Sequence, residues 1–356
     1  MGQAIIEPDD QTWDRFVRGH PHGHLLQASG WGALKGRFGW QPRRLAIADP
    51  PDGRAEPRLR AGAQILFRHR LGFGLAYVPR GPLLAGDEAT DALLLAALER
   101  LARRSHVVFL RLEPNILEDD AAADELHSCL LLRGFQPANP IQPRSTVHLD
   151  LGPPDERLLA GMSKGHRADI RRAAREGVVV RNGTSQAHLD AFYALMTATG
   201  RRAGFAIHSR AYYHAAWELF ADDARLLLAE RDGTALAGSL IAAWAGTGLY
   251  LYSGSTEAGL KSGANHALQW SALRWAKERG CTIYDFWGIP DALGRAAVAE
   301  SAAARERLEA EAQNDPLYGV FRFKKGFGGR VVRYLPAYDR VYLPALYALW
   351  QRRLRG

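Results

Sequence analysis

The order of apolar runs, turns and helix-period segments occurs twice along this chain. Residues 61–113 begin with small residues and an apolar strand, pass a glycine turn into a second apolar strand, and continue into a helix and a third strand. Residues 237–287 follow the same order. The helical segments, at 89–104 and 265–279, show the hydrophobic period of amphipathic helices. Two copies of strand, strand, helix, strand predict two similar α/β domains in tandem.

The segments outside this repeat predict loops, a domain boundary and further helices and strands. Residues 49–60 are polar and proline-rich and indicate a loop, and a domain boundary is expected near residues 143–150. Residues 291–313 are almost wholly alanine, glutamate and arginine, which predicts an exposed helix or a mobile insertion. Strand-like sequence returns at 331–342. The basic amphipathic helix at 343–355 is expected to pack on the first domain, and an anionic membrane surface is the alternative.

Composition narrows the class of protein. The 46 lysines and arginines exceed the 38 acidic residues, and this net charge of +8 favours polyanionic partners such as nucleic acid, phosphorylated metabolites or an anionic membrane face. The 2 cysteines lie far apart, which excludes a disulfide framework and a cysteine zinc site. The chain shows neither a long apolar run nor the pattern of a signal peptide, so we expect a cytoplasmic protein.

Two of the scarce lysines lie in aromatic surroundings. Lys324 follows Phe323 in the segment FRFKKGFGG, and an ammonium desolvated by aromatic rings is suited to stabilise an oxyanion or bind a phosphate. The alternative is an exposed lysine at a strand edge. Lys35 lies four residues after Trp31, which indicates either a side chain lying along a helix surface or a phosphate clamp.

Arginines supply further candidate phosphate contacts. Arg202 and Tyr213 occur in ATGRRAGFAIHSRAYY, where a guanidinium beside aromatic rings is suited to bind a phosphate in bidentate fashion. Arg167, Arg171 and Arg175 recur at a spacing of four and predict one basic stripe on a helix. That stripe is either a solvated face or a phosphate-binding one.

Metal and cofactor motifs are weak. The histidine cluster at residues 20–24 is in a proline- and glycine-containing loop without an acidic or cysteine partner, so no metal site is predicted. The chain has no GxSxG, HExxH or Walker A motif. The turn at residues 259–264 is similar to acetyl-CoA-binding loops at helix N-termini, but it lacks their residue spacing. No cofactor is predicted.

Seven motifs in one order carry a resemblance that covers about residues 13–339. They are LLQASGWGALK, YVPRGP, IQPRSTVHLDL, GHRADIRRAAREGV, TGRRAGFAIHSRAYY, YDFWGIP and FKKGFGG. Together they resemble the FemABX family of peptidoglycan interpeptide-bridge aminoacyltransferases, in its shorter type without a long helical arm. The resemblance implies an α/β fold of two tandem GNAT-like domains. The first would comprise residues 1–145 and be completed by the C-terminal segment 331–356, and the second would comprise residues 146–330.

The resemblance also implies an activity and roles for residues. The reaction would move an amino acid from aminoacyl-tRNA to the stem-peptide amine of UDP-muramyl-pentapeptide or lipid II. Lys324 would stabilise the tetrahedral intermediate, and Lys35 and Arg202 would hold the acceptor's diphosphate. The other residues implied to contact the acceptor are Trp31, Glu113, Tyr213, Tyr252 and Phe323. Without an arm, the stripe Arg167, Arg171 and Arg175 is the candidate tRNA contact.

Two other classes of function stay open at this point. One is an acyl-CoA N-acyltransferase of the same fold, and the other is a noncatalytic protein that binds nucleic acid or a membrane surface. No histidine or carboxylate in the motifs is an evident general base, so we expect the substrate to assist proton transfer. We expect a cytoplasmic monomer and leave open a peripheral contact with the inner membrane face.

Overall fold

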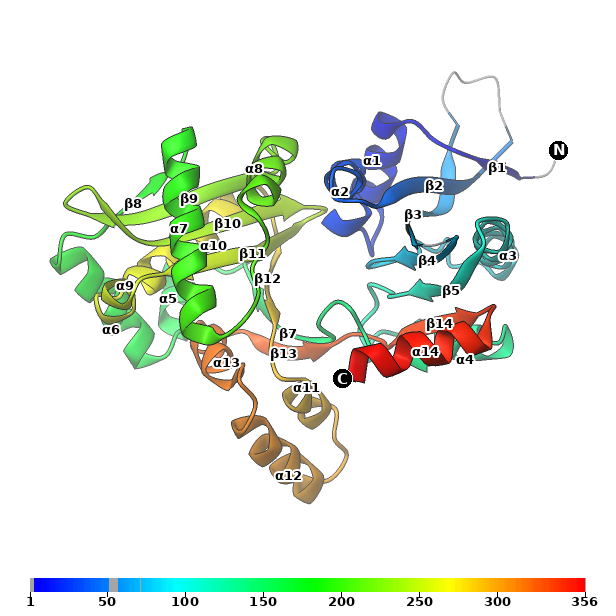
Figure 1. Ribbon diagram of the computed structural model, residues 1–356. Coiled ribbons are helices and arrows are strands. Elements are labelled where there is room, and N and C mark those ends of the chain that lie inside the picture. Colours follow the sequence, from blue (N-terminus) through cyan, green and yellow to red (C-terminus); the bar gives the residue numbers. More distant parts are fainter. Residues whose placement is uncertain (1–2, 51–56, 71, 356) are drawn as a thin grey trace. The chain divides into compact units, whose positions relative to one another are not determined.

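Two seven-stranded β-sheets with helices on their faces build the chain (Figure 1). The structure is a computed structural model and describes residues 3–50, 57–70 and 72–355. The chain divides into two units, each with one sheet. They are Met1–Arg144 together with Tyr334–Gly356, and Ser145–Arg333.

The first unit carries the strand order β1-β2-β3-β4-β5-β14-β6, in which β4 and β5 are parallel. Its elements are β1 (Ala4–Ile6), α1 (Asp10–Gly19), the 3-10 helix η1 (Leu25–Gln27), α2 (Ser29–Gly36), β2 (Gln41–Ala48), β3 (Leu59–Arg70), β4 (Phe73–Val78), α3 (Glu88–Arg104), β5 (Val107–Leu112), α4 (Ala123–Leu132), β6 (Gln136–Ala138), β14 (Ala337–Val341) and α14 (Pro344–Arg355). The amphipathic helix α3 buries Leu94 and Leu98 in a core with Ile47, Ile65 and Leu110 of the strands.

The second unit carries the strand order β13-β7-β12-β11-β10-β9-β8, in which β11 and β12 are parallel. Its elements are β7 (Ser145–Asp150), α5 (Asp155–Gly161), α6 (Lys164–Arg175), β8 (Val179–Asn182), α7 (Gln186–Ala203), α8 (Arg210–Leu219), β9 (Ala224–Arg231), β10 (Thr234–Trp244), β11 (Thr247–Ser255), α9 (Glu257–Lys261), α10 (Ala264–Glu278), β12 (Ile283–Gly288), α11 (Asp291–Ala297), α12 (Ala302–Gln313), α13 (Tyr318–Lys325) and β13 (Arg330–Arg333).

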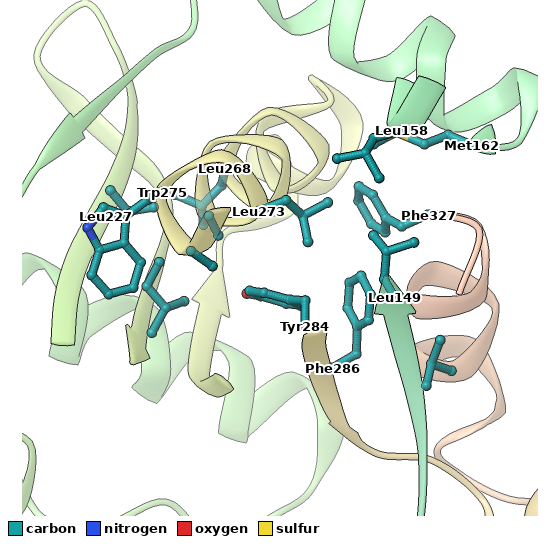
Figure 2. Close-up of a cluster of buried hydrophobic side chains, with 14 of the residues drawn as sticks. Leu149, Leu158, Met162, Leu227, Leu268, Leu273, Trp275, Tyr284, Phe286 and Phe327 are labelled. Carbon is teal, nitrogen blue, oxygen red and sulfur yellow. The ribbon is translucent and has the colours of Figure 1, made fainter. Parts of the chain in front are cut away.

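Helices α7 and α10 cover opposite faces of the second sheet (Figure 1). Figure 2 shows the α10 face, where Leu273 of α10 lies near Tyr284 and Phe286 of β12. Phe327, from the turn after α13, completes this cluster and is fully buried (Figure 2). The turn after α13 is therefore anchored in the core of the second unit.

The predicted repeat is confirmed. In the first unit β3, β4, α3 and β5 follow one another, and in the second unit β10, β11, α10 and β12 do so, with the short α9 before α10. In both copies the last strand lies parallel to the second one, β5 beside β4 and β12 beside β11. A right-handed crossover through a helix is the ordinary way to join such parallel strands.

The expectation for residues 291–313 is partly wrong. The segment forms two helices, and α11 is not exposed, because Ala292, Leu293 and Ala296 are buried against β7 and β13. Helix α12 is mostly exposed and buries Leu308 and Ala312. Small alanine side chains allow α11 to approach the sheet closely, and composition alone does not distinguish that packing from exposure.

The strand-like segment 331–342 also differs from the prediction, because it forms two strands in different sheets. β13 pairs with β7 in the second sheet, and only β14 returns to pair with β5 and β6 in the first. The segment that completes the first sheet thus begins later than residue 331. Helix α14 packs on the first unit, as expected, through Tyr347 and Trp350 against Phe109.

Two further expectations concern loops and membranes. The predicted loop 49–60 begins where expected, after β2 ends at Ala48, but it ends two residues early because β3 begins at Leu59; residues 51–56 lie outside the described residues. In the described part of the chain, no helix combines the length and the apolar character needed to cross a membrane.

A buried ion pair fastens β14 to the first sheet. The Arg111 guanidinium on β5 donates to both carboxylate oxygens of Asp339 on β14, at 2.7 and 2.6 Å. The hydroxyl of Tyr347 on α14 donates to the same carboxylate at 2.7 Å. Arg111 and Asp339 are 2% and 0% exposed, so water cannot solvate either charge if its partner is removed.

We predict that Arg111→Met lowers the free energy of unfolding by about 3–5 kcal/mol, because it leaves the Asp339 carboxylate buried without its cation. The exposed pair of Arg43 and Glu7 provides the control: Glu7→Gln should cost less than about 1 kcal/mol. Urea unfolding of both variants measures the difference. Equal decreases in the free energy of unfolding of the two variants would contradict the prediction that the buried pair contributes more than the exposed one.

Candidate active site

The parallel strands β11 and β12 separate part-way along their length. They pair only over Thr247–Leu249 and Ile283–Asp285, whereas β11 continues to Ser255 and β12 to Gly288. Beyond these three pairs β11 is bonded to β10 alone and β12 to β7. The carbonyls of the last β12 residues on the β11 side therefore need hydrogen-bond donors from elsewhere.

Lys324 supplies those donors. Its ammonium, on α13, donates to the carbonyls of Trp287 at 3.1 Å and Gly288 at 2.7 Å, and lies 5.9 Å from the ring centre of Tyr250 on β11. The side chain is 5% exposed, and burial lowers its pKa to about 7, against an opposing effect of the Asp285 carboxylate. The alternative of an exposed lysine at a strand edge is wrong for Lys324. The neighbouring residue, Lys325, is the exposed lysine, and it lies at the end of α13.

Three predicted residues gather along the unpaired half of β11. The rings of Tyr252 on β11 and Tyr213 on α8 lie 5.2 Å apart, and burial raises the pKa of both phenols. Arg202, near the end of α7, donates to the carbonyl of Ser255 at 2.8 Å. The structure thus brings Arg202, Tyr213 and Tyr252 to the strand that Lys324 also reaches.

Phe323 faces a different environment from Lys324. Its ring is half-buried and lies 5.1 Å from that of His266 and 5.2 Å from that of Phe327, and its carbonyl is 2.7 Å from Nε2 of His166. These contacts anchor α13 on α6 and α10. They place Phe323 among packing partners, and its predicted contact with a substrate stays a proposal.

The first unit holds the other predicted residues. Trp31 and Lys35 lie on α2, with the ammonium 4.7 Å from the indole ring centre, and burial lowers the pKa of Lys35 to about 8 with a further effect of Arg68. Glu113 follows β5 and is 5% exposed. It accepts from the hydroxyl of Tyr77 and from backbone N–H groups of residues 141 and 142, and burial raises its pKa.

The two copies of the repeat differ at this point. In the first unit β4 and β5 stay paired up to Val78 and Leu112, and an isolated bridge joins Gly81 to Glu113 beyond them. The side chains of Tyr77 and Glu113 fill that end of the pair. The separation of parallel strands therefore characterises the second unit alone among the two described copies.

The start of α10 is covered by α6. A Cβ atom on Gly263, which has a φ of +76°, would lie 2.3 Å from the carbonyl oxygen of Asp169. The Asp169 carboxylate lies 3.5 Å from Nδ1 of His266 in the first turn of α10, whose pKa burial lowers to about 4. In acetyl-CoA-binding loops a helix N-terminus of this kind holds a pyrophosphate. Here an acidic residue and the α6 backbone lie at that position.

The predicted basic stripe lies on α6, but its three arginines differ. The guanidinium of Arg167 donates to the carbonyls of Ala160 at 2.9 Å and Met162 at 2.5 Å, so it closes the turn between α5 and α6. Arg171 and Arg175 are exposed. In the described part of the chain, no group of three or more metal-ligating side chains is found, and His20 and His24 bond to backbone groups.

Sequence reasoning did not single out Thr146, Tyr250 or Asp285, which all lie close to Lys324 or to the carbonyls that hold it. The signal for Asp285 was an acidic residue inside the otherwise aromatic strand motif YDFWGIP. A carboxylate in a buried strand needs specific partners, which makes such a residue a candidate for function.

A model of the FemAB family matches residues 9–233 and 230–352. The chain belongs to the FemAB family. The "Lipid II:glycine glycyltransferase" of Staphylococcus aureus strain USA300 is 25% identical over 424 aligned residues, which cover 96% of this chain and 93% of that relative. The alignment is longer than the 356 residues of this FemAB-family chain, so the relative carries insertions.

Solved structures confirm the predicted fold of the FemAB-family chain. The crystal structure of FemX superimposes with a TM-score of 0.81 at 23% identity, covering 97% of this chain and 99% of FemX. A tandem GNAT protein from the clavulanic acid biosynthesis pathway gives a TM-score of 0.55 at 11% identity, covering 96% and 98%. The fold is α/β with two GNAT-like domains in tandem, and a C-terminal strand completes the first sheet.

We predict that Lys324 makes the stability of the folded chain depend on pH. Unfolded Lys324 keeps its proton up to its ordinary pKa of 10.5, whereas the folded residue loses it near 7. Because the unfolded state binds more protons in this interval, wild-type stability rises with pH relative to Lys324→Met, by up to about 1.4 kcal/mol per pH unit. Urea unfolding between pH 7 and 10 measures this slope. Lys325→Met should keep the wild-type slope, and an equal slope in Lys324→Met would contradict the prediction.

Proposed function

We propose that this FemAB-family chain is an aminoacyltransferase that moves an amino acid from aminoacyl-tRNA to the stem-peptide amine of a peptidoglycan precursor. The acceptor is UDP-muramyl-pentapeptide or lipid II. The observation that carries the proposal is the buried ammonium of Lys324 between the separated ends of β11 and β12. The name of the staphylococcal relatives, lipid II:glycine glycyltransferase, supports the reaction and the acceptor class.

The chemistry needs a stabilised oxyanion and little else. An aminoacyl ester is already activated, so attack by an amine forms the amide bond and releases the ribose hydroxyl without ATP or a covalent enzyme intermediate. The carbonyl oxygen becomes negative in the tetrahedral intermediate. A desolvated ammonium aimed at that oxygen stabilises it more than a hydrated one would. With a pKa near 7, Lys324 is charged in a large fraction of molecules at neutral pH.

The proposed acceptor contacts are of two kinds. Lys35 and Arg202 hold the diphosphate, and the residues Trp31, Glu113, Tyr213, Tyr252 and Phe323 contact the rest of the acceptor. Arg202 is bonded to the end of β11, the strand that carries Tyr252 with the Tyr213 ring of α8 against it, and this placement supports the role. The half-buried ammonium of Lys35 on Trp31 supports the same role in the first unit.

The exposed face of α6 is the proposed contact for the tRNA backbone. Arg171 and Arg175 are exposed there, while Arg167 shapes the turn before the helix. Phosphate contacts of this kind are independent of sequence and weaken with salt. We further propose a cytoplasmic monomer.

Neither alternative function accounts for the site as well. An acyl-CoA transferase needs an open helix N-terminus for the pyrophosphate, and at α10 the α6 backbone and Asp169 occupy that position. A noncatalytic protein that binds nucleic acid or membranes explains the net charge of +8 but gives no reason to bury Lys324.

The test of the function is incubation with charged tRNA pools and muramyl-pentapeptide precursors, with mass spectrometry of the products. We expect a precursor heavier by one amino acid residue. Lys324→Met should lower kcat about 100-fold, as for loss of one oxyanion donor, with little change in the acceptor KM. Lys325→Met, one residue away and exposed, is the matched control and should retain near-wild-type turnover. Absence of product with every charged tRNA would refute the function, and full turnover in Lys324→Met would remove that residue from the mechanism.

Loss of an acceptor contact should raise only the KM for the acceptor, and loss of a donor contact only the KM for the donor. Lys35→Met and Arg202→Met each remove a charge-assisted phosphate contact of about 1.5–3 kcal/mol, so the acceptor KM should rise roughly 10- to 100-fold while the donor KM stays unchanged. Arg171→Gln with Arg175→Gln should instead raise the donor KM and flatten its salt dependence.

The control for these charge changes is Arg305→Gln with Arg307→Gln, which removes two exposed charges from α12 and should alter neither KM. Stable variants of Lys35 and Arg202 with a normal acceptor KM would show that these side chains serve folding only.

A further inference from the structure

The end of β12 is a β-bulge. Asp285 pairs with His148 of β7 and Gly288 pairs with Thr146, so two residues of β12 lie opposite the single Val147. Trp287, inside the bulge, has a φ of +63°, in the left-handed region that residues other than glycine rarely adopt. The bulge brings the carbonyls of Trp287 and Gly288 to the same ammonium, that of Lys324.

Two buried polar side chains hold this bulge. The backbone N–H of Trp287 donates to Oδ1 of Asp285 at 2.7 Å. The hydroxyl of Thr146 lies 2.5 Å from the same carboxylate oxygen and 2.9 Å from the Trp287 carbonyl, and its single proton serves one of them at a time. Asp285 and Thr146 are each 1% exposed, so water does not replace these contacts. An unusual backbone conformation persists only where its surroundings fix it in this way.

Asp285 also supplies the negative charge near Lys324. Nε2 of His148 on β7 lies 3.6 Å from Oδ2 of the same carboxylate. On β11, burial raises the pKa of Tyr250 to about 12, so this phenol is neutral at neutral pH. The histidines packed on α13 are His166 of α6 and His266 of α10, and the pKa of His266 is about 4, which leaves it uncharged.

We propose that Asp285 and Thr146 are positioning residues for the acyl transfer. They fix the bulge whose two carbonyls hold Nζ of Lys324 between β11 and β12, and Asp285 provides the counter-charge of the ammonium. This inference rests on the proposed function. It assigns to two side chains, from strands about 140 residues apart in the sequence, the placement of the reacting charge.

The first experiment separates charge from shape. Asp285→Asn keeps an oxygen that accepts from Trp287 but removes the counter-charge. Because Lys324 acts as an ammonium and its counter-charge favours the protonated form, the alkaline limb of the kcat profile should move to lower pH by about one unit. The acceptor KM should not change. A purely structural role of Asp285 would lower kcat equally at all pH values.

The second experiment tests Thr146. Thr146→Val removes the hydroxyl at nearly constant volume and should lower kcat about 10-fold, and Thr146→Ser should restore most of it. Thr90→Val is the matched control, since Thr90 is a buried threonine of the first unit with a side-chain hydrogen bond to Gln3. That variant should leave kcat and its pH profile unchanged. Equal kcat values for Thr146→Val and wild type would overturn the role of Thr146.

A substrate-free measurement keeps this inference distinct from the proposed function. The rate at which acetic anhydride labels Lys324, followed by peptide mass spectrometry across pH, reports the pKa of that residue directly. We expect a lower midpoint in Asp285→Asn than in wild type. An unchanged midpoint overturns the role of Asp285 even where transfer is observed. If wild type shows no transfer, the proposed function fails while the labelling result still decides whether Asp285 supports the ammonium. If Asp285→Asn does not fold, the valine and serine variants of Thr146 decide the proposal by the same labelling.

Discussion

The separation of β11 from β12 is the constraint on which the candidate active site depends. A parallel pair that stops after three residue pairs leaves backbone carbonyls inside the protein without the donors that a neighbouring strand normally provides. The chain satisfies two of them with the ammonium of Lys324. The same hydrogen bonds that complete the backbone of β12 therefore place a cation where the two strands separate.

A lysine fits this place in a way that an arginine does not. The chain carries 46 basic residues and uses lysine for only a few of them, yet it buries one here. A compact ammonium donates to two adjacent carbonyls, and its pKa falls to about 7 on burial, so that it is charged only in part at neutral pH. The buried guanidinium of Arg111 shows the contrast, because it stays charged and needs the full bidentate pairing of Asp339. That ion pair fastens β14 to the first sheet, whereas the ammonium of Lys324 bonds to two carbonyls and has one further N–H donor.

The two copies of the repeat have the same topology but differ where their parallel strands end. In the first unit the parallel strands stay together, and the buried carboxylate of Glu113, bonded to Tyr77, closes their end. In the second unit the strands separate, and the bulge of β12, the ammonium of Lys324 and the ring of Tyr250 lie at their separated ends. The same repeat thus buries a carboxylate at the end of a paired strand couple in the first unit, and an ammonium between separated strands in the second.

The sequence by itself determined the two repeats, their helices and strands, and the family, because these follow from hydrophobic period and from motifs within short segments. It also marked Lys324 as unusual, from its scarcity and its aromatic neighbours. It did not reveal that α11 is buried, since alanine is compatible with both close packing and exposure. Nor did it assign residues 331–333 to the second sheet, because a short strand has no local signal for its partner. The burial of Lys324 and its support by Asp285 and Thr146 were decided by the tertiary structure alone. The carbonyls that hold the ammonium lie about 36 residues before Lys324 in the sequence. Thr146 of β7, which supports them, lies about 140 residues before Asp285 of β12, so only folding brings these groups into contact.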